Sequence, residues 1–343
     1  MNKNEVLLSI IVPVYNVEEY LEECLDSLVS QDIPHKEYEI VCIDDGSTDK
    51  SGEILDFYAK QYPNIMVVHK ENGGVSSARN RGIDIAKGQY IWFIDADDFI
   101  KQNCLSAIKP KIIENKYDTI RILIYSFNHG ESQISLSMVT PDMCQRAIKN
   151  FSVTYILKRS NIINNKIHLD PRISYAEDAI FMLQVIPFIK NAVTIRDLVI
   201  YFYRQRPGSA TSQDVSKKIS SRLYGALVCE EIIQGKRVGD VEGAYRFKYI
   251  SVVKIIELIF KLSKPEQNKI IDCLKSNNLF PLKYSPKYTP KFRQNKTSLV
   301  KKIRNTLIDF SYMQIGLIAL KLYYFILSLY KKRNRIKIRR TKI

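Results

Sequence analysis

The sequence carries neither of the two common glycine-rich signatures for nucleotide binding. No G-x-G-x-x-G motif follows its first apolar segment, and no G-x-x-x-x-G-K-[ST] motif occurs anywhere in its 343 residues. In dinucleotide-binding and P-loop proteins these glycines let the backbone approach the phosphates closely. Their absence counts against nicotinamide-cofactor chemistry and against P-loop nucleotide chemistry.

The cysteines form no C-x-x-C pair, and the sequence gives no expectation of a secretory leader. The six cysteines stand at positions 24, 42, 104, 144, 229 and 273. This scatter argues against a zinc site or a disulfide framework, and it suits a reducing cytosol. Met1–Glu5 runs directly into a short strand-like segment, so we expect no secretory signal.

The composition is that of a folded globular protein, with 45% hydrophobic and 26% charged residues. We expect strands within residues 7–16, 39–43, 65–69 and 90–94, and helices at about residues 18–30, 50–62 and 76–87. Strands and helices that alternate at this pitch form βαβ units. The sequence therefore predicts an α/β fold with a mostly parallel sheet and helices on both faces.

Acidic residues follow two of the expected strands. Asp95-Ala96-Asp97-Asp98 follows residues 90–94, and Asp44-Asp45 follows residues 39–43. In an open parallel sheet, ligands bind outside the carboxyl ends of the strands. Two such carboxylates can share a hard divalent cation with the phosphates of a substrate, which predicts a metal–diphosphate site at Asp95 and Asp97. Taken alone, an acidic turn that caps the next helix explains the same residues.

Two further features of this region suit a nucleotide ligand. Asp44 and Asp45 can accept hydrogen bonds from a base or a ribose, or can cap the helix that follows. The Gly73-Gly74 turn opens a helix that carries Arg79 and Arg81, and arginine donates two parallel hydrogen bonds to phosphate oxygens. This arrangement is a candidate diphosphate cradle, and a solvated basic helix face is the alternative.

Four motifs together resemble the ordered signature of family 2 glycosyltransferases: SIIVPVYN at 9–16, IDDGSTD at 43–49, NGGVSSARNRG at 72–82 and IDADD at 94–98. The resemblance covers about the first 100 residues. It implies a GT-A fold, a nucleotide-sugar donor that is usually UDP-linked, a divalent metal held by the D-x-D motif, and inversion at the anomeric carbon.

The resemblance also implies roles for individual residues. It places Pro13, Tyr15, Asp44 and Asp45 around the nucleoside, Gly74 and Arg79 near the donor, and Asp95, Ala96 and Asp97 at the ribose and diphosphate, with Asp95 and Asp97 holding Mn²⁺ or Mg²⁺.

A general base is still required, because an inverting transfer must remove the proton of the acceptor hydroxyl. Tyr175–Leu183 resembles the Glu-Asp motif of the family, set where a helix is expected to start. The helix dipole at that position helps to keep a carboxylate ionised. We expect Asp178 to be the base and Glu177 to help position the acceptor; without the upstream motifs, ordinary first-turn acids would be the preferred interpretation.

Two later segments are less regular. Thr154–Arg159 stands where many relatives have a Trp-Asn-Lys stretch, and it lacks that Trp and Asn. Tyr201–Ser209 resembles the strand and loop that end the catalytic region in many bacterial members. Arg204 and Arg206 within it are candidates to close on the diphosphate, with solvated loop arginines as the alternative.

The second half predicts a different organisation. We expect a catalytic domain at residues 1–215, a helical region at 216–280, a linker at 281–300 and a basic amphipathic tail at 301–343. From Lys296 onward, thirteen basic residues oppose one acid, so the tail carries about +12 of the net charge of +16. Lys321 interrupts its apolar segment, which favours a helix lying on an anionic membrane surface over one that spans it.

These features predict an inverting, metal-dependent hexosyl- or N-acetylhexosaminyltransferase. It would move a sugar from a UDP-sugar donor to a hydroxyl of a growing polysaccharide or lipid-linked oligosaccharide, as in capsule or exopolysaccharide synthesis. We expect it in the cytoplasm, peripherally attached to the inner face of a bacterial cell membrane. A polyprenyl-phosphate acceptor is the enzyme alternative. A catalytically silent nucleotide-sugar-binding partner ranks low, and nucleic-acid binding is not expected because the basic residues cluster in the tail and no nucleic-acid motif occurs.

Overall fold

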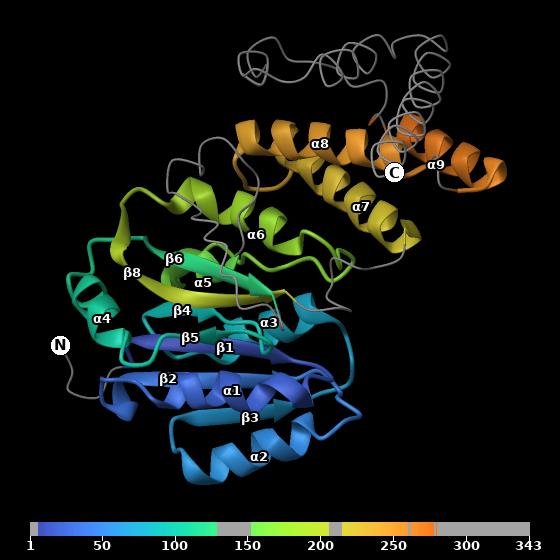
Figure 1. The fold of residues 1–343 in the computed structure, drawn as a ribbon. Coiled ribbons are helices and arrows are strands. Elements are labelled where there is room, and N and C mark those ends of the chain that lie inside the picture. Colours follow the sequence, from blue (N-terminus) through green and yellow to red (C-terminus); the bar gives the residue numbers. More distant parts are fainter. Residues whose placement is uncertain (1–5, 129–151, 206–214, 260–261, 278, 280–343) are drawn as a thin grey trace, which may run out of the picture. The chain divides into compact units, whose positions relative to one another are not determined.

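The computed structural model describes residues 6–128, 152–205, 215–259, 262–277 and 279. The chain divides into two compact units, Met1–Phe247 and Lys248–Ile343. The first unit holds the sheet and every residue of the candidate site (Figure 1). The expected linker at 281–300 and tail at 301–343, like the loop-rich stretch at 129–151 and Arg206, lie outside the described residues.

One eight-stranded sheet forms the centre of the first unit, in the order β3-β2-β1-β4-β7-β6-β8-β5. The strands are β1 Leu8–Val14, β2 Tyr38–Asp44, β3 Ile65–His69, β4 Tyr90–Phe93, β5 Phe99–Ile100, β6 Thr119–Asn128, β7 Tyr155–Lys158 and β8 Ala192–Gln205. The pairs β1–β2, β2–β3, β1–β4 and β6–β8 are parallel. β7 runs antiparallel between β4 and β6, and β5 runs antiparallel to β8. The predicted α/β fold with a mostly parallel sheet is confirmed.

Helices follow the strands as the alternation predicts. They are α1 Glu18–Val29, α2 Ser51–Gln61, α3 Val75–Ile85, α4 Leu105–Ile113, α5 Arg159–Ile163, α6 Glu177–Val185, α7 Val215–Ile233, α8 Val241–Ile259 and α9 Lys264–Ser276. Within the described ranges, short 3₁₀ turns lie at His35–Glu37, Ser152–Thr154 and Ile186–Phe188. Within the described ranges, no helix has both the length and the apolar character needed to cross a membrane.

Alternate residues of the central strands build two apolar layers, one on each face of the sheet. Ile10 of β1 and Trp92 of β4 pack with residues of α1, α2 and α4, whereas Ile11 and Phe93 pack with residues of α3, α5 and α6. α1 and α2 lie on the same side of the first three strands (Figure 1). Because the central strands are covered on both faces, they read as nearly continuous apolar runs in the sequence.

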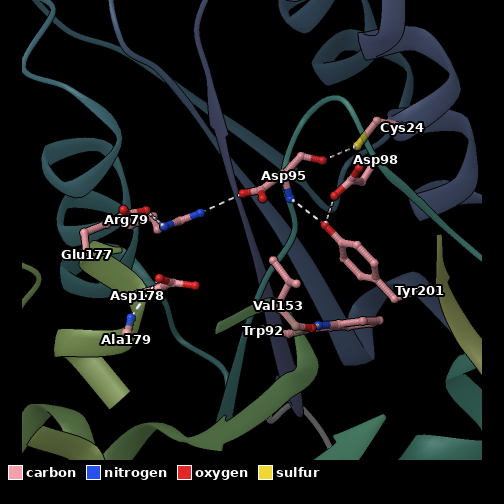
Figure 2. Close-up of polar contacts among 10 residues, drawn as sticks. All are labelled: Cys24, Arg79, Trp92, Asp95, Asp98, Val153, Glu177, Asp178, Ala179 and Tyr201. Atoms are coloured by element: carbon pink, nitrogen blue, oxygen red, sulfur yellow. Dashed lines mark hydrogen bonds and ion pairs between the residues drawn. The ribbon is translucent and has the colours of Figure 1, made fainter. Parts of the chain in front are cut away.

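Trp92 shows how tightly β4 is held. Its ring is fully buried, and its indole N–H donates to the carbonyl of Val153 at 2.8 Å (Figure 2). Burial of a large apolar side chain contributes about 1.5–3 kcal/mol, and the hydrogen bond removes the cost of burying the N–H. The strand that leads into the acidic turn is therefore a rigid support.

Candidate active site

The three carboxylates of the acidic turn after β4 differ in how far they are buried. The amide of Asp98 donates to the carbonyl of Asp95 at 3.0 Å, which closes the turn. Asp95 and Asp97 are half-buried, Ala96 between them is buried, and Asp98 is almost completely buried. The turn therefore presents Asp95 and Asp97 toward the strand-end surface and directs Asp98 into the protein.

Arg79 of α3 connects this turn to the start of α6. Its guanidinium donates to Asp95 Oδ1 at 2.7 Å and to Glu177 Oε1 at 2.8 Å (Figure 2). The guanidinium also lies 5.8 Å from the ring centre of Phe93 and is buried. Burial alone would lower the pKa of Arg79, but the charges of Asp95 and Glu177 raise it above its usual range, so the arginine stays charged.

Asp178 differs from these ion-paired carboxylates in its contacts and in its pKa. It lies beside Glu177 in the first turn of α6, and its Oδ1 accepts a hydrogen bond from the amide of Ala179 at 2.8 Å. Burial, followed by the like charge of Glu177, raises the pKa of Asp178 to about 7, although the positive charge of Arg79 opposes the shift. A carboxyl group with this pKa exchanges protons readily near neutral pH.

Tyr201 and Arg204 of β8 hold the acidic turn in place through hydrogen bonds. The Tyr201 hydroxyl donates to Asp98 Oδ2 and accepts from the amide of Asp95 at 3.3 Å (Figure 2). The amide of Arg204 donates to Asp98 Oδ1 at 2.8 Å, and its Nε donates to the carbonyl of Asp97 at 3.0 Å. Every residue of the turn except Ala96 is thus tied to β8.

Arg204 is itself fixed by α1 and by the strand that follows the turn. Its guanidinium forms an ion pair with Glu23 and lies 5.2 Å from the ring centre of Tyr20 and 5.7 Å from that of Phe99. These contacts support the turn. Closing of Arg204 over a diphosphate, which the sequence suggested, stays a prediction.

Asp44 and Asp45 organise the loops after β2 and β3. Asp45 is buried; its carboxylate accepts from the amides of Gly73 at 3.0 Å and Gly74 at 2.7 Å and pairs with Lys70. Asp44 accepts from the amide of Ser47 at 2.9 Å and contacts Nδ1 of His69 at 2.7 Å. Asp44 and Asp45, which the sequence predicts to lie around the nucleoside, therefore hold the loops that follow β2 and β3 in place.

The remaining predicted residues lie at the carboxyl end of β1 and at the start of α3. Pro13 is half-buried and Tyr15 is 49% exposed, just beyond the end of β1. Gly74, the residue before α3, has φ +83°, a conformation that other residues adopt only at a cost. The structure joins Arg79, Asp95 and Glu177 by direct contacts, whereas Asp45 contacts Gly74 and the neighbouring Asp44 contacts Ser47 and His69.

The chain resembles known proteins in sequence and in fold. Residues 9–170 match the family described as "Glycosyl transferase family 2". The glycosyltransferase GlyG of Streptococcus pneumoniae is 31% identical over 64% of this chain and 82% of its own length. The chain belongs to glycosyl transferase family 2.

Further proteins are similar to this chain in sequence or in fold. The poly(ribitol-phosphate) beta-glucosyltransferase of Bacillus spizizenii is 34% identical over 71% of this chain, which spans only 39% of that relative's length. The crystal structure of Staphylococcus aureus TarS residues 1–349 in complex with UDP superposes with a TM-score of 0.63 and 25% identity, covering 80% of this chain and 81% of that one.

Sequence reasoning missed several residues that support this family 2 site. Tyr201 was taken only as part of a strand, although a tyrosine in a buried strand needs a partner for its hydroxyl. His69 and Lys70 lie at the end of β3, just as the acidic residues lie at the ends of β2 and β4. That strand-end position was the feature of the sequence that could have identified them as site residues. Nothing in the sequence around Glu23 distinguishes it from the other acids of α1.

The chemistry of the acidic turn suits a hard divalent cation. Asp95 and Asp97 offer carboxylate oxygens, the ligands that Mg²⁺ and Mn²⁺ take together with substrate phosphates. Among the residues that the structure describes, no three His, Cys, Asp or Glu side chains cluster to hold a metal ion by themselves. Asp95 and Asp97 are the residues that would hold a cation at this turn, together with phosphate oxygens of a donor.

Proposed function

We propose that this protein is an inverting glycosyltransferase that uses a UDP-sugar donor. The observation that carries the proposal is the Arg79 bridge, which sets the D-x-D carboxylate Asp95 and the Glu177-Asp178 pair around one strand-end surface. An inverting transfer needs these two parts on opposite sides of the sugar, one for the leaving diphosphate and one for the incoming hydroxyl. UDP is proposed as the nucleotide because TarS, a relative with the same fold, binds it.

The base in this proposal is Asp178. Its pKa of about 7 leaves it largely ionised at slightly alkaline pH, and its carboxylate then takes the proton of the acceptor hydroxyl as that oxygen attacks the anomeric carbon. Glu177 is held by Arg79 and so is unavailable as a free base. We therefore assign Glu177 to positioning, which agrees with the role expected from the sequence.

Asp95 and Asp97 would hold Mn²⁺ or Mg²⁺ together with the donor. When bound, the ion supplies positive charge that stabilises the departing nucleoside diphosphate. The protein's own part is to fix the turn: Tyr201 and Arg204 hold the main chain on both sides of Asp97, so the carboxylates need little reorganisation when the donor arrives.

The acceptor in this proposal is a hydroxyl of a growing polysaccharide or lipid-linked oligosaccharide, at the cytoplasmic face of a bacterial membrane. A polyprenyl phosphate is the competing acceptor. Because such a phosphate is already ionised at neutral pH, it would need no base. Asp178→Asn separates the two, since transfer to a hydroxyl would be lost and transfer to a phosphate would persist.

The first test is donor turnover by the purified full chain. Release of nucleoside diphosphate is measured for a panel of UDP-sugars and GDP-mannose with Mn²⁺, with and without a chelator. Metal-dependent release from one donor that is lost in Asp97→Ala is the expected result. Release from no donor, together with no thermal shift on adding UDP, would reject the proposal.

A further inference from the structure

Two arginine–tyrosine cation–π contacts join α7 to the loop that leads into α6. The Arg222 guanidinium lies 5.0 Å from the ring centre of Tyr175, and the Arg172 guanidinium lies 5.4 Å from that of Tyr224. In each pair one partner comes from the loop and the other from α7. All four side chains are at least partly open to solvent.

The two arginines differ in charge balance. Nε and a terminal nitrogen of Arg172 donate to the two carboxylate oxygens of Asp170, at 2.9 and 2.6 Å, so its charge is neutralised within the loop. Across the part of the chain that the structure describes, Arg222 has no ion-pair partner and contacts the ring of Tyr175. Arg172 therefore stabilises the loop through Asp170, whereas the positive charge of Arg222 is available to bind an anionic ligand.

The contact with Tyr175 also sets how Arg222 can act. A guanidinium in cation–π contact with a ring spends no hydrogen-bond donor on that contact, so its N–H groups stay available for other partners. The planar fork of these groups matches two oxygen atoms of a phosphate and donates two parallel hydrogen bonds to them. The contact reduces the rotamer freedom of Arg222, so less entropy is lost when an anion binds.

The position of this arginine relates it to the proposed base. Tyr175 precedes Asp178 by three residues, so their Cα atoms are at most about 11 Å apart. The loop is fastened to α7 beside Arg222: the hydroxyls of Ser174 and Ser221 are 2.9 Å apart, and the Ser174 amide donates to the Ser221 hydroxyl at 3.1 Å. Arg222 thus lies beside the loop that leads directly into Asp178.

We propose that Arg222 binds a phosphate group of the acceptor, and that the acceptor is a phosphate-bearing polyol or saccharide whose attacking hydroxyl reaches Asp178. The inference rests on the proposed transferase function and names its acceptor class. Two sources share this chemistry: a polymer with phosphodiester links, or a saccharide joined to a lipid by a diphosphate. The lone charge of Arg222 fits one phosphate near the reacting hydroxyl in either source.

Binding of three probes to the full chain, saturated with UDP and Mn²⁺, tests this inference by calorimetry. The probes are a poly(ribitol phosphate) fragment, a short-chain prenyl-diphosphate-linked N-acetylglucosamine and a phosphate-free N-acetylglucosamine disaccharide. The variants are Arg222→Gln, Arg222→Lys and, as the matched control, Lys217→Gln, which removes one charge from an exposed position of the same helix.

Arg222→Gln is expected to weaken binding of at least one phosphate-bearing probe by about tenfold or more, because a charge-assisted contact is lost. Arg222→Lys should restore part of the affinity, Lys217→Gln should change it by less than about twofold as expected for a solvated charge, and the neutral disaccharide should not respond to Arg222→Gln. The probe that responds identifies the source of the phosphate.

Three results would overturn the inference: no binding of either phosphate probe to the unaltered chain, equal effects of Arg222→Gln and Lys217→Gln, or equally tight binding of the neutral disaccharide. Donor turnover and the UDP thermal shift are measured on the same preparations. If both persist while Arg222→Gln changes nothing, the transferase stands and only the phosphate inference fails. If both are absent, the proposed function itself fails.

Discussion

The guanidinium of Arg79 and the carboxylate of Asp95 form an ion pair of 2.7 Å that joins α3 to the end of β4. Because Arg79 is buried and also holds Glu177, its removal would leave two carboxylates facing each other without a cation. Removing one partner of a buried ion pair costs about 3–5 kcal/mol, and the partial exposure of Asp95 places the expected loss near the lower end. We predict that Arg79→Met lowers the free energy of urea unfolding by about 3 kcal/mol.

Arg79→Lys is the companion variant, because it keeps the charge but not the planar fork. We expect it to lose less stability than Arg79→Met and still to lose most donor turnover, since one ammonium group cannot hold Asp95 and Glu177 in the same positions. Unfolding midpoints and nucleoside diphosphate release are compared for both. Full turnover in Arg79→Lys would mean that the bridge is not needed for catalysis.

Asp178→Asn should remove the base and leave the fold intact. General-base contributions are typically about 10²- to 10⁴-fold, so we expect the rate of transfer to a hydroxyl to fall by a factor in that range. The donor KM should change little, because Asp178 does not contact Asp95. Donor hydrolysis and sugar transfer are measured separately, and transfer that survives in Asp178→Asn would favour an acceptor that is already ionised.

The pKa of Asp178 gives this site a specific pH dependence. Because burial and Glu177 raise that pKa to about 7, the base is protonated below this pH. Activity should therefore rise with pH through about 7 and level off above it. The free energy of unfolding should change in the opposite direction. Because the pKa of Asp178 is higher in the folded state, the protonated carboxyl favours folding at low pH, and this contribution is lost as pH rises from about 4 to 7.

Asp178→Asn serves as the control for both profiles. The variant cannot ionise at this position, so the difference in thermal midpoint between it and the unaltered chain should widen as pH rises from 4 to 7. Asp98, whose pKa burial also raises, is present in both proteins and cancels in the comparison. A constant difference across this range would show that Asp178 titrates at its ordinary pKa.

The support of the acidic turn by β8 predicts an effect on metal affinity. Tyr201→Phe removes the hydroxyl that contacts Asp98 and the amide of Asp95, and Arg204→Lys removes the Nε–H that contacts the carbonyl of Asp97. Leaving a buried polar group without its partner costs about 1–3 kcal/mol. We expect the Mn²⁺ concentration for half-maximal turnover to rise about tenfold in either variant, consistent with a loss of about 1.4 kcal/mol.

The measurement is turnover against Mn²⁺ concentration at saturating donor. At saturating metal the maximal rate should return to within about threefold of the original, because no reacting group has been changed. A lowered maximal rate at every metal concentration, with an unchanged half-maximal point, would assign Tyr201 and Arg204 a role other than holding the turn.

The sequence predicted the elements whose signal is local. β1 to β4 and the first three helices were placed within a few residues, since apolar periodicity and the acids at the strand ends mark them directly. The antiparallel β7 between β4 and β6 was not predicted. Pairing of Tyr90 with Lys158 depends on contacts between residues far apart in the chain, which no local pattern encodes.

The candidate site divides in the same way. Asp95, Glu177 and Arg79 were named from their motifs, but the contact of Tyr201 with Asp98 spans 103 residues and left no motif. Asp45 was expected to face a ligand, and its hydrogen bonds to the glycine turn became visible only when the loops were placed together. Motifs identified which residues matter, and packing determined how they are held.

Gly82 in α3 gives a test of the packing behind the site. A Cβ at this position would lie 2.3 Å from Cγ2 of Ile11, a fully buried residue of β1. Alanine normally stabilises a helix relative to glycine by about 1 kcal/mol, whereas overpacking costs about 1–3 kcal/mol. We predict that Gly82→Ala lowers the free energy of unfolding by about 1–2 kcal/mol.

A double-mutant cycle with Ile11→Ala isolates this contact. Ile11→Ala alone should cost about 2–5 kcal/mol because it leaves a cavity in the layer shared with α3. In the double variant the added methyl group occupies part of that space, so the combined loss should be smaller than the sum of the two by at least about 1 kcal/mol. Urea unfolding of the four proteins gives the coupling directly. Additive losses would mean that α3 and β1 do not approach as closely as the structure shows, and the position of Arg79 on the same helix would then need revision.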